Sequence, residues 1–278
     1  MLSLPCPNDD AEQTYRRMAV HTRDLALRNS LLAEGARVGV RAAEYLHLAN
    51  QEKLYLFETE APIGVSAEEL TKVYDRVLVR GAGRPTYDRL KASARLNRCP
   101  LCGQRDVKTI DHYLPKSSYP ELAVFPANLI PSCSDCNFIK RGYVPATHAA
   151  QTFHPYFDDW SVHRILRATV EVGEHVEVVF SIEAVTGFAQ ASLRRAEQHF
   201  DLLGLGALYA GHAAVELVQS KDIYRRNFGA GVDVLRSELQ HTSLSRERGN
   251  INAWAAALYR GLADSDEFCQ GGFEFIED

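Results

Sequence analysis

Two pairs of cysteines with the same spacing constrain this chain more than any other feature. Cys99 and Cys102 form the first pair, in "CPLC", and Cys133 and Cys136 form the second, in "CSDC". A spacing of two residues places both sulfurs of a pair on one side of a tight turn, and two such turns supply the four thiolates of a tetrahedral zinc site. The sequence therefore predicts a structural Zn²⁺. Because no coordination position stays open, this metal is expected to hold the module together and to do no chemistry.

The remaining cysteines and the N-terminus indicate the compartment. Cys6 and Cys269 stand alone, and the N-terminal residues have neither a basic start nor a long apolar stretch. No segment approaches the roughly 18 consecutive apolar residues of a membrane-spanning helix. We therefore expect a cytoplasmic protein without a membrane segment, in which paired C-x-x-C motifs indicate metal before disulfide. A redox role is the less favoured alternative, since there are two pairs and no thioredoxin-like context.

Hydrophobic periodicity divides the chain into three regions and predicts a mainly helical α+β fold. Region 1–95 is expected to be helical: apolar residues recur at helical spacing over 11–53, and Ser66 with Glu69 forms a capping box for a helix to about residue 79. Region 96–145 is the cysteine module. Region 146–278 begins with an alternating, valine-rich β-hairpin over 162–185 and continues as helices, with an aromatic tail expected to dock.

Polar residues within the module exceed what a simple zinc ribbon needs. "VKTIDH" and "FPANLIP" are predicted strands, and "SDCNFIKRG" is a predicted short helix with Ser134 as a possible cap. Asp111 and His112 end the first strand, and Asn128 lies on the second. A regular strand would send Asp111 and His112 to opposite faces, so we expect the strand to end or bend at His112. The result is a ββα arrangement held by zinc.

The chemistry of these side chains suits phosphodiester hydrolysis. His112 is the only histidine within the module and can be neutral near pH 7, which suits a general base. Asp111 and Asn137 offer the oxygen ligands that Mg²⁺ or Mn²⁺ prefers. Lys140 follows Asn137 by three residues, so both can share one helical face. Three cations are candidate phosphate contacts, with a solvated helix end as the alternative: Lys140, Arg141 and Lys116.

The stretch from Cys99 to Gly142, with "DHYLPKS" and "NLIPSCSDCNFIK", resembles the HNH endonuclease superfamily and its ββα-metal fold. The resemblance implies that His112 is the general base, that Asp111 and Asn137 bind the catalytic cation, and that Asn128 orients the histidine-bearing loop. Lys140 would contact phosphate. Asn137 stands where the family's name has a histidine, which favours Mg²⁺ or Mn²⁺ over a transition metal. The segment from Asn250 onward also resembles the ends of HNH proteins encoded beside an ATPase in Septu-type phage-defence systems.

The expected function is therefore a metal-dependent HNH endonuclease acting on DNA, with an RNase of the same chemistry or a non-catalytic zinc module as alternatives. Residues 91–145 carry a net charge of +4 while the rest of the chain carries −9, from a total of −5. A locally basic site on an acidic body can still bind a polyanion. The acidic flanks favour a protein partner, which we hypothesise to be an ATPase that gates cleavage.

Overall fold

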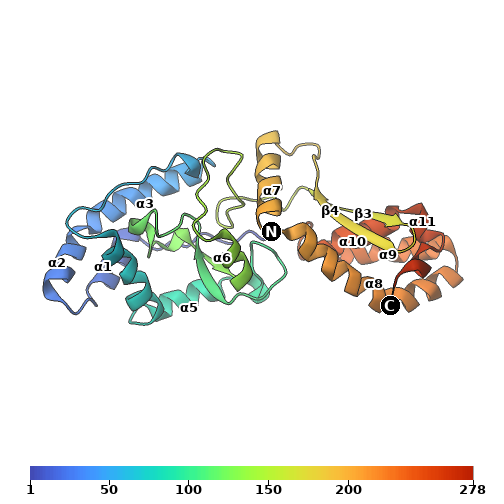
Figure 1. Ribbon diagram of the computed structural model, residues 1–278, viewed down its shortest axis with the longest axis horizontal. Coiled ribbons are helices and arrows are strands. Elements are labelled where there is room, and N and C mark those ends of the chain that lie inside the picture. Colours follow the sequence, from blue (N-terminus) through green and yellow to red (C-terminus); the bar gives the residue numbers. More distant parts are fainter. Residues whose placement is uncertain (278) are drawn as a thin grey trace. The chain divides into compact units, whose positions relative to one another are not determined.

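The computed structural model describes residues 1–277 and divides into two compact units, Met1–Asp159 and Trp160–Asp278 (Figure 1). Each unit has its own helices and one two-stranded antiparallel sheet. The fold is thus α+β and mostly helical, as expected. The predicted boundary after residue 95 falls inside the first unit, where residues from the N-terminal helices and from the cysteine module, such as Tyr15 and Leu129, share one apolar core.

The N-terminal helices of the first unit are shorter than the sequence predicts. Residues 11–53 were expected as one helix, but Asp24 begins a new helix by accepting a hydrogen bond from the Leu27 amide at 2.8 Å, which is an N-cap. Glu34 separates that helix from the next. The helical elements of this unit are α1 (Ala11–Ala19), α2 (Leu25–Ala33), α3 (Gly35–Ala49), η1 (Leu54–Leu56), α4 (Ala67–Val73), η2 (Tyr74–Val79), α5 (Arg84–Ala92) and η3 (Arg95–Asn97).

Helix α4 begins with the predicted capping box, since Ser66 and Glu69 exchange both hydrogen bonds. It continues into η2, which is a π-helical turn, so helical structure extends to Val79 as predicted. The chain then doubles back: the amides of Gly81 and Gly83 both donate to the Val77 carbonyl, at 3.1 and 2.9 Å. A Cβ atom on Gly81 would lie 2.6 Å from the Arg76 carbonyl oxygen, so only glycine fits this close return.

The cysteine module has the predicted ββα order. Strand β1 (Thr109–His112) pairs antiparallel with β2 (Leu129–Ser132), with His112 opposite Leu129, and α6 (Ser134–Lys140) follows. Two details differ from the prediction. Asn128 lies in the 3₁₀ turn η5 (Pro126–Asn128), which begins at Pro126, and β2 starts only at the next residue. The cap of α6 is Cys133, and not Ser134. A further 3₁₀ turn, η4 (Pro120–Leu122), lies between the strands.

The second unit contains the predicted hairpin, β3 (Leu166–Val172) and β4 (Val176–Ile182), which pair along their full length. Strand β3 lies close to α10 at Gly261. A Cβ atom on Gly261 would lie 2.3 Å from the carbonyl oxygen of Ala168 in β3. The tail docks as expected, with Phe268, Phe273 and Ile276 buried. The helical elements are α7 (Gln190–Leu202), α8 (Leu205–Gly229), α9 (Val232–Glu247), α10 (Trp254–Asp264), α11 (Asp266–Cys269) and η6 (Gly272–Phe275).

No single helix within residues 1–277 has both the length and the apolar composition to cross a bilayer; α7 and α8 reach them only as a pair bent by 67°.

Candidate functional site

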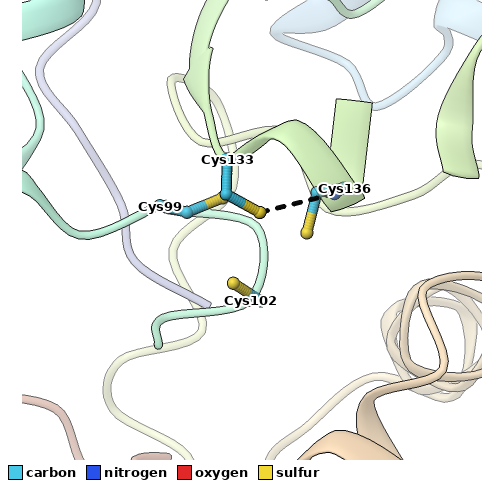
Figure 2. A group of neighbouring side chains, drawn as sticks. All are labelled: Cys99, Cys102, Cys133 and Cys136. Atoms are coloured by element: carbon cyan, nitrogen blue, oxygen red, sulfur yellow. Dashed lines mark hydrogen bonds between the residues drawn. The ribbon is translucent and has the colours of Figure 1, made fainter. Parts of the chain in front are cut away.

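The four predicted cysteines converge on one point (Figure 2). Their sulfurs all lie within 4.8 Å of one another, and all four residues are buried. A zinc ion with about 2.3 Å bonds to four sulfurs separates them by about 3.8 Å, so little movement is needed to bind one. Among residues 1–277 this is the one group of three or more His, Cys, Asp or Glu ligand atoms gathered in this way. The cluster can hold zinc, as the spacing predicts.

Local backbone geometry prepares the cysteine sulfurs to act as thiolates. Gly103, with φ of +66°, lets the first turn close so that its amide donates to the Cys99 carbonyl at 2.7 Å. The Arg105 amide donates to Cys102 Sγ, and the Cys136 amide donates to Cys133 Sγ (dashed in Figure 2), both at 3.4 Å. Hydrogen bonds from backbone amides favour the charged form of sulfur.

Charge around the cluster also favours a metal. Hydrogen bonds among the four thiols lower the pKa of Cys102 and raise the pKa of Cys99 and Cys136. Four thiolates around Zn²⁺ leave a net charge of −2, which is unfavourable in a buried site without a cation nearby. The Arg105 guanidinium interacts electrostatically with the cysteines and lies 2.8 Å from Asp135 of the second turn. Arg105 therefore joins the two turns and offsets part of that charge.

Asp111 and His112 stand at the end of β1, as expected. The Asp111 side chain folds back so that Oδ1 accepts the His112 amide at 2.8 Å. His112 Nε2 lies 2.9 Å from the Ala123 carbonyl oxygen. A carbonyl only accepts, so Nε2 carries the hydrogen, and a neutral ring then has Nδ1 as its acceptor. No described residue forms a hydrogen bond with Nδ1.

His112 is held neutral by its surroundings. Burial lowers its pKa to about 3, opposed by the hydrogen bond to the Ala123 carbonyl, because a buried imidazolium loses its hydration. The Tyr74 ring packs edge-on against the imidazole with 4.6 Å between centroids, and the Tyr74 hydroxyl reaches the Ile110 carbonyl. Neither Tyr74 nor the Ala123 carbonyl was identified from the sequence, because a backbone acceptor and a remote ring leave no local signal.

Asn128 is fully buried and ties down the chain that follows His112. Its Oδ1 accepts the Leu114 amide at 2.8 Å, and its Nδ2 donates to the Leu114 carbonyl at 2.9 Å. These two bonds replace the ladder partner that Leu114 lacks beyond the end of β1. The arrangement fixes the loop two residues after His112, which is the role that the resemblance implies for Asn128.

Lys140 corrects the prediction of a direct phosphate contact. Its side chain is 3% exposed, and its ammonium donates to the carbonyls of His112 and Tyr113 at 2.6 and 2.8 Å. Asp111 Oδ2 lies 3.2 Å from the same nitrogen as an ion pair. The long side chain reaches back under β1 because α6 packs against that strand. Lys140 therefore holds Asp111 and His112 in place through the ion pair with the Asp111 carboxylate and the hydrogen bond to the His112 carbonyl.

The other predicted residues lie at the surface of the module. Asn137 is half-buried on α6, one turn before Lys140 and on the same face, which places it beside β1. Lys116 pairs with Asp75 at 2.9 Å and covers the Tyr74 ring, so this ammonium already has partners. Arg141 is exposed, with its guanidinium 3.6 Å above the ring of Phe138.

Replacing Lys140 by methionine is expected to lower the free energy of unfolding by about 3–5 kcal/mol, because Asp111 is left buried without its counter-charge. The matched control is Lys116→Met, which removes a half-exposed ion pair that contributes about 0–1 kcal/mol. Urea titration of both variants measures the difference. Equal stability of the two variants would contradict the structural role of Lys140 and favour the earlier prediction that it contacts phosphate.

Comparisons with known proteins find a similar phage protein, but its name describes no activity. The chain is 27% identical to "Protein ea31" of Escherichia phage lambda over 297 aligned residues, covering 98% of this chain and 100% of that protein. No protein-family model matches the sequence, and no solved structure matches it. The name of the phage protein states no activity, so the functional argument rests on the geometry of the module.

Proposed function

We propose that this protein is a metal-dependent endonuclease of the HNH type that hydrolyses phosphodiester bonds in DNA. The observation that carries the proposal is the state of His112: its Nε2 is committed to the Ala123 carbonyl, which makes Nδ1 the basic atom, and Asp111 is its direct neighbour. The ββα order around a closed cysteine cluster supports the same reading. A zinc module that only binds a partner has no need for this pair.

In the proposed reaction His112 accepts a proton from the attacking water through Nδ1. The Ala123 carbonyl holds the ring in one tautomer throughout, and Asn128 holds the loop that follows it. A bound phosphate brings negative charge near the imidazole, which raises its pKa from the low value of the free site. Burial raises the pKa of Asp111, and the Lys140 ammonium, which lies 3.2 Å from its Oδ2, opposes that rise and favours the charged carboxylate.

The oxygen atoms beside His112 fit a hard divalent cation. Asp111 Oδ2 is buried and pairs with the Lys140 ammonium at 3.2 Å, and Asn137 can add an amide oxygen from α6. One carboxylate and one amide are typical of Mg²⁺ or Mn²⁺ sites that substrate phosphate and water complete. Such a cation, held by Asp111 and Asn137, would neutralise charge that develops on the phosphate. The cysteine cluster differs in kind, since it offers only sulfur.

The substrate and partner follow from charge. Residues 91–145 carry +4 within a chain of −5, so we propose that nucleic acid meets the protein at the module and that the acidic remainder faces a protein partner, such as an ATPase. DNA is the proposed substrate, and RNA with the same cleavage chemistry is the alternative. Parallel assays on plasmid DNA and on single-stranded RNA separate the two.

A structural zinc and a separate catalytic Mg²⁺ or Mn²⁺ predict a specific pattern of metal dependence. Protein carrying zinc is expected to nick supercoiled plasmid only when Mg²⁺ or Mn²⁺ is added, since a four-thiolate zinc has no open position. Brief EDTA treatment should abolish cleavage, and Mg²⁺ alone should restore it while the zinc content, measured by mass spectrometry, stays constant. Restoration by zinc and not by Mg²⁺ would contradict the assignment of the two sites.

A further inference from the structure

A cavity lies in the first unit, and none of the four clustered cysteines lines it. It measures about 690 Å³ and is enclosed by the turn before α2, by α2 itself and by the segment from α4 to Ala82. Ligand pockets for small molecules commonly measure about 300–1,000 Å³. Its floor contains Leu31, Val73 and Val77, which are buried members of the apolar core. The cavity therefore has a fixed apolar base.

Three arginines surround the mouth of this cavity: Arg23, Arg76 and Arg80. All three are exposed, and within residues 1–277 none forms a hydrogen bond or an ion pair. Most arginines of this chain are paired, among them Arg16, Arg84 and Arg89. Three unpaired guanidinium groups on one small opening repel one another, so an anion there is favourable.

The carboxylates at the rim, Asp24 and Glu69, offset only part of the charge of the arginines. Asp24 accepts the Leu27 amide as the cap of α2, and Glu69 accepts the amide and hydroxyl of Ser66 at 2.8 and 3.0 Å. Lys72, also at the rim, pairs with Glu68 outside the cavity. Asp24 and Glu69 also hold the two helix starts in place, and they are outnumbered by the three arginines, so an excess of positive charge remains at the mouth.

We propose that this cavity binds a nucleotide. The phosphates would lie on Arg23, Arg76 and Arg80, and the base would cover the apolar floor of Leu31, Val73 and Val77. Inorganic phosphate alone would leave that floor in water, and a duplex is too wide for a cavity of this size. The nucleotide is either free in solution or an unpaired residue of a strand, since both present the same chemistry.

Binding is tested directly, without any need for cleavage. Isothermal titration of the full chain with AMP, with ADP and with inorganic pyrophosphate is expected to give binding by the nucleotides, more weakly by pyrophosphate. The double variant Arg76→Glu, Arg80→Glu is expected to lose at least tenfold in affinity. Arg226→Glu is the matched control: Arg226 is exposed on α8, forms no hydrogen bond or ion pair with the residues that the structure describes and lies outside the cavity, so the affinity should not change.

The outcomes are distinct. A short single-stranded oligonucleotide that binds where AMP and ADP do not, with the same loss in the double variant, would identify a strand as the source of the nucleotide. Absence of binding by all of these probes at millimolar concentration would overturn the proposal, as would an equal loss in Arg226→Glu. Thermal melting of each variant checks its folding. Because the titration measures no cleavage, its failure leaves the nuclease proposal untouched, and an inactive nuclease leaves this one untouched.

Discussion

Serine in place of Cys136 is expected to release the zinc and to unfold the module. Structural zinc contributes about 10–16 kcal/mol in zinc-finger peptides, which is comparable to the about 5–15 kcal/mol of total stability of a typical domain. Cys136 is fully buried and its sulfur belongs to the cluster. The change therefore removes a ligand for which no neighbouring group can substitute. Amide hydrogen exchange in β1 and β2, with zinc content from mass spectrometry, measures the effect.

The matched control is Cys6→Ser. Cys6 is exposed and lies in the same unit, outside the cluster, so its replacement should leave both zinc content and exchange protection unchanged. Full protection of Thr109–His112 in a zinc-free Cys136→Ser protein would show that apolar packing alone holds the module. The zinc would then be dispensable for the fold, contrary to the structural role derived from the closed thiolate set.

His112→Ala is expected to reduce the rate of plasmid cleavage by about 10²–10⁴-fold, the usual contribution of a general base. Folding should survive, because the substitution removes a ring that makes one side-chain hydrogen bond, to the Ala123 carbonyl. His148→Ala serves as the control: His148 is half-buried outside the module, lies 3.6 Å from Glu52 and packs edge-on against Tyr55. Initial rates at saturating Mg²⁺, with a melting curve for each protein, give the comparison.

A second variant separates the base from the cation site. Asn137→Ala should raise the Mg²⁺ concentration needed for half-maximal cleavage, whereas His112→Ala should lower the rate at every Mg²⁺ concentration without moving that midpoint. Cleavage by His112→Ala at the wild-type rate would remove the nuclease proposal, since no other histidine lies within the module. A shifted midpoint in His112→Ala and not in Asn137→Ala would reverse the two roles.

Sequence spacing predicted the parts of this site that depend on neighbours in the chain. Cysteines separated by two residues must share a turn, so the cluster was predictable. The end of the strand at His112 was also predictable, because it depends only on nearby residues such as Pro115. The position of Lys140 was not. A lysine at a helix end normally faces water, and only the packing of α6 against β1 directs its ammonium to the His112 and Tyr113 carbonyls. Burial of that kind depends on three-dimensional packing.

The boundaries of the helices show the same distinction. Apolar periodicity continues through residues 11–53 and gives no sign that α1 ends at Ala19 and that Asp24 caps the next helix. The contact of Tyr74 with His112 joins residues 38 positions apart in the sequence, and no pattern within either segment encodes it. The capping box at Ser66 was predictable because its two hydrogen bonds lie within four residues.

The π-helical turn of η2 makes the length of this segment critical. Its first residues face the module, with Tyr74 on His112 and Asp75 on Lys116, while Arg76, Val77 and Arg80 line the cavity. A π-helical turn contains one residue more than an α-helical turn, so deleting one residue from Tyr74–Val79 would remove a side chain either from the face toward the module or from the cavity lining. Homologous chains are therefore expected to vary in sequence here while keeping the residue count between Ser66 and Gly81 constant.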